Sequence, residues 1–385
     1  MDHQQLNSSA LTLPDSAIAL RNEIRTFLVQ ELAEGNFTPE CDAWIAGFSP
    51  AFSAKLGQRG WLGMTWPRKY GGHERSTLDR FVVTEELLAA GAPVAAHWVA
   101  DRQTGPLLLR YGTEEQRLHF LPKIARGECY FSIGMSEPDA GSDLAAIRTH
   151  ARRVEGGWRL QGRKIWTSWA HRAHYILVLC RTSPPEKDRH AGMSQMIVEL
   201  SSPGVNIEPI ISIAGQHHFN EVAFDDVFVP DSMVLGQIGQ GWKQVMGELA
   251  FERSGPERSF STFPLLVELV RQLGPQPEAR EAEALGRLAA RLWTLRRMSL
   301  AVAHMLNRGA LPDVEAALVK DLGTRFEREV AEVARTLLPA APALDAPDQF
   351  NALLAQALLT APSYTLRGGA TEILRGIVAR RLKSL

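Results

Sequence analysis

The chain has 385 residues, of which 45% are hydrophobic and 22% are charged, and its formal net charge is −1. This balance is typical of a soluble globular protein with two or three structural units, and it excludes the basic surfaces of proteins that bind nucleic acid or acidic membranes. No apolar run reaches the roughly 18 residues of a transmembrane helix, and the polar start lacks secretory-signal features. Cys41, Cys129 and Cys180 lack metal or disulfide spacing. A cytoplasmic, reduced setting is therefore expected.

The first part of the chain, residues 1–128, has the apolar spacing of amphipathic helices. Gly35 is expected to end the first long helix, and Thr113 is expected to cap a later one. Trp61 and Trp66 are interpreted as core aromatics that pack a corner between helices. The pattern therefore predicts an N-terminal α-helical domain.

Between residues 129 and 235 the apolar period changes to two, which predicts a mostly antiparallel β domain. Gly156-Gly157 is expected to form the centre of a two-residue hairpin turn. The apolar runs at residues 173–182 and 193–200 are predicted strands, with a loop between them.

From residue 236 to residue 385 the helical pattern returns. The first long candidate helix is expected to break at Gly255-Pro256, because proline has no N–H to continue the helix. Residues 281–307 and 313–338 are predicted to form two long antiparallel helices, and a last helix is expected from Thr371 onward.

Two segments of the middle region carry polar groups where a strand ends. The apolar run FSIGM stops at Ser136-Glu137-Pro138, and small residues continue to Asp143. A strand end of this kind can line a polar ligand, although by itself it is more typical of a plain strand-to-loop corner. Further along, KIWTSW carries Trp166, Thr167 and Ser168.

Together, SEPDAGSD at residues 136–143 and KIWTSW at residues 164–169 resemble the paired motifs of the acyl-CoA dehydrogenase family, (T/S)EPxAGSD and K-x-W-(I/V)-(T/S)-N. Either motif alone is weak, but the pair at this spacing is specific, and the resemblance extends over nearly the whole chain. It implies an α+β fold with an N-terminal α-helical domain at residues 1–128, a middle β domain at residues 129–235 and a C-terminal four-helix bundle domain at residues 236–385.

The resemblance also implies a reaction and its participants. FAD would serve an α,β-dehydrogenation of an acyl-CoA thioester to the trans-2-enoyl-CoA, as part of fatty acid or lipid metabolism. A carboxylate would remove the α-proton, and flavin N5 would accept the β-hydride. Electron-transfer flavoprotein is the expected electron acceptor, and the expected assembly is a homodimer, a homotetramer or a heteromer with a homologous subunit.

The resemblance assigns site residues by their match to the family motifs. The expected cofactor-binding residues are Met135, Ser136, Trp166, Thr167, Ser168, Thr371 and Glu372. The expected substrate-binding residues are Ser142, Arg253, Gly368 and Gly369. An indole can cover one face of a flavin ring, and a hydroxyl can hydrogen-bond to the reduced ring. The alternatives are that Trp166 is a core residue and that Glu372 is only a helix N-terminal charge.

The catalytic base departs from one common family pattern. In many members a glutamate precedes the Gly-Thr-x-Glu-Ile segment, but here that position is Gly368. Isovaleryl- and long-chain-type members carry the base on an earlier helix instead, where this chain has Phe251-Glu252-Arg253. The resemblance therefore makes Glu252 the expected base. The alternative is a solvent-exposed Glu252 paired with its neighbouring arginine.

Independent physical chemistry adds one point in favour of Glu252. Pro256 has no N–H to donate to the carbonyl of residue 252, so the helix is expected to be disturbed at that turn. Such a disturbance would help to aim the glutamate into a cleft.

A metal site is not expected. His217, His218 and Glu221 form an HxxE pattern, which supplies too few ligands, and no Cys/His cluster accompanies it.

Two departures from the family leave other functions open. The R-x-x-F-G segment and the glycine-rich stretch with which a neighbouring subunit contacts flavin in the family are both missing. Arg258 or Arg271 is a candidate to contact the pyrophosphate in their place, and the alternative is that a homologous subunit supplies these contacts. One alternative is a non-catalytic or half-site subunit of a heteromeric acyl-CoA dehydrogenase. The other is a dehydrogenase of acyl-carrier-protein thioesters.

Overall fold

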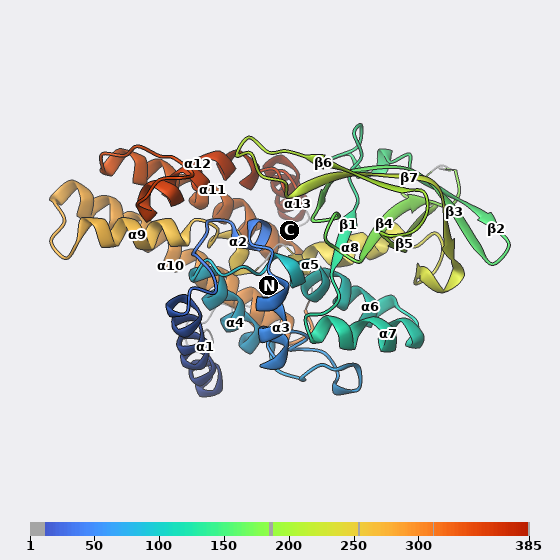
Figure 1. Ribbon diagram of the computed structural model, residues 1–385, viewed down its shortest axis with the longest axis horizontal. Helices are drawn as coiled ribbons and strands as arrows, with labels where there is room; N and C mark the ends of the chain where they lie inside the picture. The colour runs from blue at the N-terminus through green and yellow to red at the C-terminus, as the bar shows by residue number, and fades with distance from the viewer. Residues whose placement is uncertain (1–11, 185–187, 253–254, 311, 384–385) are drawn as a thin grey trace. The chain divides into compact units, whose positions relative to one another are not determined.

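The protein is described by a computed structural model that covers residues 12–184, 188–252, 255–310 and 312–383 (Figure 1). By its internal contacts the chain divides into two compact units. The helical unit comprises Met1–Phe48, Arg75–Val94 and Ala250–Leu385, and the sheet unit comprises Ser49–Glu74 and Ala95–Leu249.

The helical unit is built around a core of leucine, alanine and phenylalanine side chains. Its elements are α1 (Asp15–Ala33), α2 (Ala43–Ala46), α4 (Thr77–Ala89), η7 (Pro256–Arg258), α9 (Phe263–Leu273), α10 (Ala279–Asn307), α11 (Asp313–Leu337), α12 (Gln349–Tyr364) and α13 (Thr371–Lys383). Helix α11 packs against α9, α10, α12 and α13. Buried Leu265, Leu288, Phe326 and Leu353 come from four different helices of this bundle, which confirms the helical C-terminal part.

The sheet unit contains the described strands and several short helices. The strands are β1 (Phe131–Gly134), β2 (His150–Val154), β3 (Gly157–Ser168), β4 (Tyr175–Arg181), β5 (Met193–Glu199), β6 (Val205–Ile210), β7 (Phe219–Pro230) and β8 (Val234–Leu235). The helical elements are α3 (Pro50–Gln58), η3 (Arg68–Tyr70), α5 (Ala95–Val99), η4 (Ala100–Thr104), α6 (Gly105–Tyr111), α7 (Glu114–Ala125), η5 (Leu144–Ala146) and η6 (Asp231–Met233). Helix α8 (Gly241–Glu252) follows the sheet along the chain.

The strands form one sheet in the order β6-β7-β3-β2-β4-β5-β8, with β1 also paired to β4. The β1–β4 and β2–β4 pairs are parallel and the other pairs are antiparallel, which confirms the predicted mostly antiparallel domain. Strand β4 is buried on both faces: Ile176 and Val178 belong to one apolar cluster, and Leu177 belongs to another beside Phe120 of α7. Burial on both faces explains why β4 is a continuous apolar run and not an alternating one.

The predicted hairpin forms, but its turn lies one residue earlier than expected. Val154 pairs with Gly157, so the turn residues are Glu155 and Gly156, and Gly156 has a φ of +71°. Gly157 instead begins β3, where it pairs with Val154 and Pro230. A Cβ at this position would meet the carbonyl oxygen of Val229 at 2.4 Å. The second glycine therefore allows close approach of β7 and does not shape the turn.

Several local predictions are confirmed. The Thr113 side chain accepts from Gln116 N, and the Gln116 side chain accepts from Thr113 N, as a capping box at the start of α7. Trp61 and Trp66 are buried. The break predicted at Gly255-Pro256 falls between the end of α8 and the turn η7.

Two further observations concern cysteines and membrane spans. Cys41, Cys129 and Cys180 are buried free thiols. Within the part of the chain that the structure describes, no helix combines the length and apolar character needed to cross a bilayer.

Candidate functional site

The two sequence motifs of the sheet unit lie side by side. The end of β1 runs along the second half of β3, where Ile165 N donates to Ser136 O at 2.9 Å. Lys164 Nζ reaches across to donate to Met135 O at 2.9 Å. The predicted residues Met135 and Ser136 are thus adjacent to the segment that carries Trp166.

A buried ion pair fastens this junction. Lys164 Nζ lies 2.8 Å from Glu137 Oε1, and the two side chains are 0% and 7% exposed. The Glu137 carboxylate also accepts from Arg148 N at 2.6 Å and from Thr149 N at 2.9 Å. Burial alone would raise the pKa of Glu137, but Lys164 and these backbone donors hold that pKa below its ordinary value. Both residues stand inside the two motifs, but no local sequence pattern indicates that they pair.

The segment that follows Lys164 leaves the regular strand conformation. The β3–β7 register shifts between Lys164 and Thr167. Trp166 and Trp169 have φ values of +59° and +54°, which are unusual for bulky side chains. The alternative that Trp166 is a core residue is wrong, because the bulge leaves this residue 57% exposed.

The hydroxyl residues of the bulge are more enclosed than the tryptophan before them. Thr167 is buried, and its Oγ1 has no hydrogen-bond partner within the described part of the chain. Ser168 is partly buried, and its carbonyl accepts from Ser132 Oγ at 2.7 Å. An exposed indole beside hydroxyl groups is a surface that can take a planar aromatic ligand with polar edges.

Most of the loop after Glu137 is exposed, although Ala140 is buried. Ser142 lies at the surface beside Asp143, which accepts from Arg189 Nη2 at 2.6 Å. Asp139 lies 3.6 Å from Arg148 Nη1. These ion pairs are exposed to solvent and hold the loop only weakly, so the Ser142 hydroxyl is accessible at the surface.

The remaining described candidates lie in the helical unit, at the start of α13. Gly368 and Gly369 have φ values of +66° and +100°, which favour glycine. Buried Lys320 Nζ donates to Gly369 O at 2.8 Å. Thr371 is the first residue of α13, and its buried Oγ1 finds no hydrogen-bond partner among the residues that the structure describes. Glu372 is exposed in the first turn, where a negative charge is also favourable for the helix itself.

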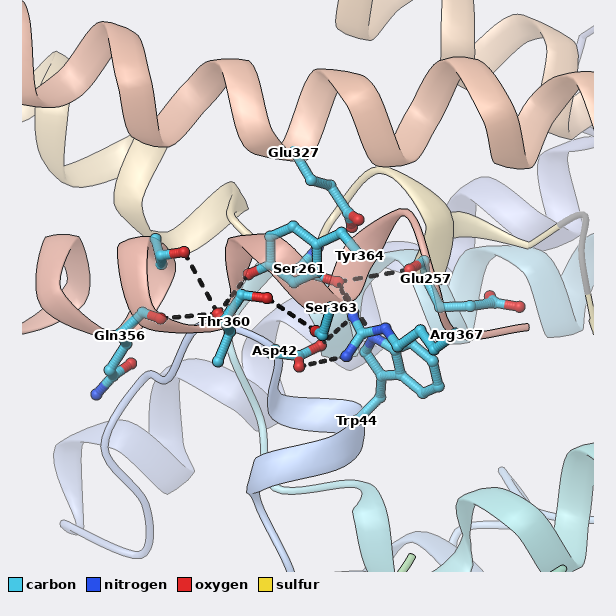
Figure 2. A network of polar contacts seen from close by, with 11 residues as sticks. Asp42, Trp44, Glu257, Ser261, Glu327, Gln356, Thr360, Ser363, Tyr364 and Arg367 are labelled. Atoms are coloured by element: carbon cyan, nitrogen blue, oxygen red, sulfur yellow. Dashed lines mark hydrogen bonds and ion pairs between the residues drawn. The ribbon is translucent and has the colours of Figure 1, made fainter. Parts of the chain in front are cut away.

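A buried polar network holds the segment before these glycines (Figure 2). Arg367 donates two hydrogen bonds to Asp42, at 2.5 and 2.6 Å, and its guanidinium lies 4.5 Å from the Trp44 ring centroid. In the same network, Glu327 Oε1 accepts from Ser261 N at 2.9 Å. The position before Gly368 is therefore fixed by a bidentate ion pair with the buried carboxylate of Asp42.

The predicted base lies where helix α8 ends. Glu252 is the last residue of α8, and Arg253 lies outside the described residues. Of the two arginines considered for the pyrophosphate, Arg258 is 1% exposed and lies 5.1 Å from a Trp44 ring centroid. The other, Arg271, pairs with Glu268 of its own helix at 2.6 Å.

The histidines considered for a metal make other contacts. His217 Nε2 lies 2.7 Å from Asn220 Oδ1, and Glu221 pairs with Arg163 at 3.0 Å. Among the residues described, no group of three or more His, Cys, Asp or Glu side chains is arranged to hold a metal ion.

The chain matches three family models in succession. Residues 14–128 match "Acyl-CoA dehydrogenase, N-terminal domain", residues 132–227 match "Acyl-CoA dehydrogenase, middle domain", and residues 239–383 match "Acyl-CoA dehydrogenase, C-terminal domain".

Two similar proteins come from Mycobacterium tuberculosis. Acyl-CoA dehydrogenase IpdE1 is 35% identical over 343 residues, which cover 87% of each chain. Acyl-CoA dehydrogenase FadE34 is 32% identical over 372 residues, which cover 94% of this chain and 50% of that protein. The chain thus spans nearly all of one relative and about half the length of the other.

Two solved structures share the fold over nearly their whole length. The structure described as "Tcur3481-Tcur3483 steroid ACAD" has a TM-score of 0.84 at 29% identity, over 97% of this chain and 99% of that one. A chain of the ChsE4-ChsE5 complex from Mycobacterium tuberculosis has a TM-score of 0.79 at 28% identity, over 97% and 98%.

The Lys164–Glu137 pair gives a first prediction. Lys164→Met should lower the free energy of unfolding by about 3 kcal/mol or more, because Glu137 would stay buried without its cation. Urea denaturation measures this change. Adding Glu137→Gln should recover part of the loss, since an amide oxygen still accepts from the backbone. Arg189→Met, which breaks an exposed pair, serves as control and should cost less than about 1 kcal/mol. A similarly small loss for Lys164→Met would contradict the assignment.

The buried network gives a second prediction, on pH. Burial raises the pKa of Glu327 from 4.5 to about 7. The folded chain therefore binds this proton more tightly than the unfolded chain, and the resulting stability is full below pH 4.5 and lost as the pH rises through 7. Glu327→Gln should reduce the fall in stability between those values by up to about 1.4 kcal/mol per pH unit.

Thermal unfolding of both proteins across this pH range is the measurement. Glu332→Gln is a matched control, because Glu332 lies on the same helix but is exposed and paired with Arg335. Parallel pH profiles for the original chain and Glu327→Gln would contradict the raised pKa.

Proposed function

Because this chain belongs to the acyl-CoA dehydrogenase family, we propose that it catalyses the FAD-dependent α,β-dehydrogenation of an acyl-CoA thioester to the trans-2-enoyl-CoA. The observation that carries the proposal is the junction of residues 135–137 with the bulge at residues 164–168. FAD, when bound, supplies the acceptor for the β-hydride.

The residues of this junction fit a flavin ring. The Thr167 hydroxyl is a buried polar group with no hydrogen-bond partner among the described residues, and Trp166 presents a largely exposed aromatic surface. Trp166 would cover one ring face, and the Ser136, Thr167 and Ser168 hydroxyls would bond to the polar ring edge, beside the Met135 side chain.

The start of α13 supports a second cofactor contact. Its first-turn N–H groups and the unpartnered Thr371 hydroxyl suit a phosphate or ribose oxygen, with Glu372 beside them. Gly368 and Gly369, whose positive φ values exclude most side chains, would let an acyl-CoA thioester approach the backbone. Ser142 and Arg253 would contact the CoA portion.

The α-proton would be removed by Glu252. Gly368 has no side chain to serve as base, and its φ of +66° would strain a glutamate there. A carboxylate at the end of α8 is the alternative position that the family offers. A carboxylate that becomes shielded from water by substrate has its pKa raised, which favours proton abstraction.

The substrate and its electron acceptor are narrower proposals. One structural relative is named as a steroid enzyme, so a panel of acyl-CoA esters should include steroid-derived side chains besides straight and branched acyl groups. Electron-transfer flavoprotein is the proposed acceptor, and its reduction in a coupled assay would test this. The three buried free thiols motivate a cytoplasmic location, which cell fractionation would test.

A half-site subunit is the second candidate function. Two structural relatives carry names of two-chain assemblies, Tcur3481-Tcur3483 and ChsE4-ChsE5. This chain also lacks the R-x-x-F-G segment through which a neighbouring subunit contacts flavin. A homologous partner would then complete the cofactor site, whereas a homodimer or homotetramer would use rearranged contacts.

Flavin retention tests the cofactor proposal. Purified protein should show flavin absorbance or acquire it with added FAD, and Trp166→Ala should weaken FAD binding roughly tenfold, because an aromatic stacking surface is lost. Phe228→Ala, which removes another exposed aromatic residue of the sheet unit, is the control. The cofactor assignment fails if the protein cannot be reconstituted with FAD either alone or with a homologous subunit.

Replacement of Glu252 tests the base. Glu252→Gln should retain FAD but lower turnover roughly 10²- to 10⁴-fold, and Glu252→Asp, which keeps a carboxylate, should retain more activity than the amide variant. Dye reduction with acyl-CoA measures turnover, and the absorbance spectrum confirms equal flavin content. Near-normal turnover by Glu252→Gln would exclude this residue as the base.

The ratio of flavin to chain separates the two assemblies. Protein expressed alone should form a stable homo-oligomer with one FAD per chain if the chain completes its own site. Light scattering gives the mass, and absorbance gives the flavin content. Empty or unstable protein that a co-expressed homologue rescues, with fewer flavins than chains, would instead establish the half-site subunit.

A further inference from the structure

A cluster of three polar side chains lies against the strained bulge of β3. Asn220 on β7 is fully buried and stands opposite Thr167 in the β3–β7 pairing. Its Nδ2 donates to Thr167 O at 3.0 Å. Its Oδ1 lies 3.1 Å from His171 Nδ1 and 2.7 Å from His217 Nε2. These three residues are called the Asn220 cluster below.

The hydrogen bonds of the Asn220 cluster define its proton arrangement. An amide oxygen only accepts, so His171 Nδ1 and His217 Nε2 must both carry a hydrogen and donate to it. The opposite orientation of the amide would point its NH2 group at two imidazoles and its oxygen at the Thr167 carbonyl. Asn220 is therefore held in one orientation, with its donor directed at the bulge.

The two histidine rings reinforce each other. Their centroids are 3.8 Å apart and their planes are 15° from parallel. Burial, followed by the neighbouring His217, lowers the pKa of His171. The stacked rings thus form a close-packed support on the side of Asn220 that faces away from Thr167.

The bulge needs such support because its backbone is strained. Trp166 and Trp169 both have positive φ values, and bulky residues persist there only when surrounding contacts determine the conformation. Two other contacts act at the far end of the bulge, Ser132 Oγ to Ser168 O and Trp169 N to His218 O. The Asn220 amide is the side-chain donor to the carbonyl of Thr167, between the exposed indole and Ser168.

We propose that Asn220, oriented by His171 and His217, is a positioning residue that holds the Trp166–Ser168 bulge in its flavin-receiving conformation before the cofactor binds. This inference rests on the proposed function, since it concerns the FAD that the bulge would contact. Preorganisation of this kind strengthens binding, because the strained conformation does not have to form when the ligand arrives. Loss of the Asn220 donor should therefore weaken FAD affinity in protein that is still folded.

The experiment is an FAD titration of the full chain after removal of its flavin, followed by flavin fluorescence. Asn220→Asp removes the donor to Thr167 and keeps an acceptor for both histidines, so its FAD dissociation constant should rise roughly tenfold. Asn206→Ala is the matched control, because Asn206 is an exposed asparagine on the adjacent strand β6. Its dissociation constant should equal that of the original chain.

Two replacements of His217 separate positioning from general packing. His217→Gln can keep a donor at the place of Nε2 and should retain most of the affinity, whereas His217→Phe keeps the ring but loses the donor and should bind FAD several-fold more weakly. Thermal unfolding of the flavin-free proteins is measured in parallel. A merely structural role would lower the unfolding temperature and leave the FAD dissociation constant of the folded protein unchanged.

The outcomes are distinct. If the original chain binds FAD and the FAD dissociation constants of Asn220→Asp and His217→Phe equal that of the original chain, this inference is overturned. The proposed function then remains intact. An original chain that takes up no FAD, alone or with a homologous subunit, overturns both. If Asn220→Asp does not fold, the comparison of His217→Phe with His217→Gln decides the result.

Discussion

The ion pair between Lys164 and Glu137 is the interaction on which the sheet unit's site depends. Two charges leave water here, which is unfavourable unless every remaining hydrogen-bonding group is satisfied. Lys164 meets this condition by also donating to Met135 O, and Glu137 meets it by accepting from Arg148 N and Thr149 N. An apolar pair of similar size would leave these backbone groups buried without partners.

This pair has a consequence for the conformation of β3. It fastens the strand at Lys164, immediately before the register shift, while pairing with β7 resumes at Thr167. The chain between these points has to bulge, and the bulge turns Trp166 outward into solvent. A strained segment with an exposed indole is an unfavourable surface for a folded protein, and the proposed binding of a planar ligand would account for it.

In the helical unit, an ion pair likewise fixes a segment of unusual backbone conformation just before α13. Arg367 pairs with buried Asp42 and lies over the Trp44 ring, and the two residues that follow are glycines with positive φ. The backbone conformation there is one that a glutamate adopts only with strain. The lack of a carboxylate at Gly368 is consistent with this backbone conformation, and the proposed base, Glu252, belongs to the earlier helix α8 instead.

The order of helices and strands follows from the sequence by itself, because apolar period, proline and capping residues act over a few neighbouring residues. Thr113 and the break before Pro256 are examples, and the paired motifs identified the family because their residue types and spacing are specific. Tertiary structure decided what depends on distant partners. Gly157 belongs to β3 and not to the turn because it pairs with β7, whose Val229 carbonyl leaves no room for a Cβ. Trp166 is exposed because β3 pairs with β7 at Lys164 and at Thr167, on both sides of the bulge. The roles of Glu137 and Asn220 arise from atoms far apart in sequence, which no local pattern records.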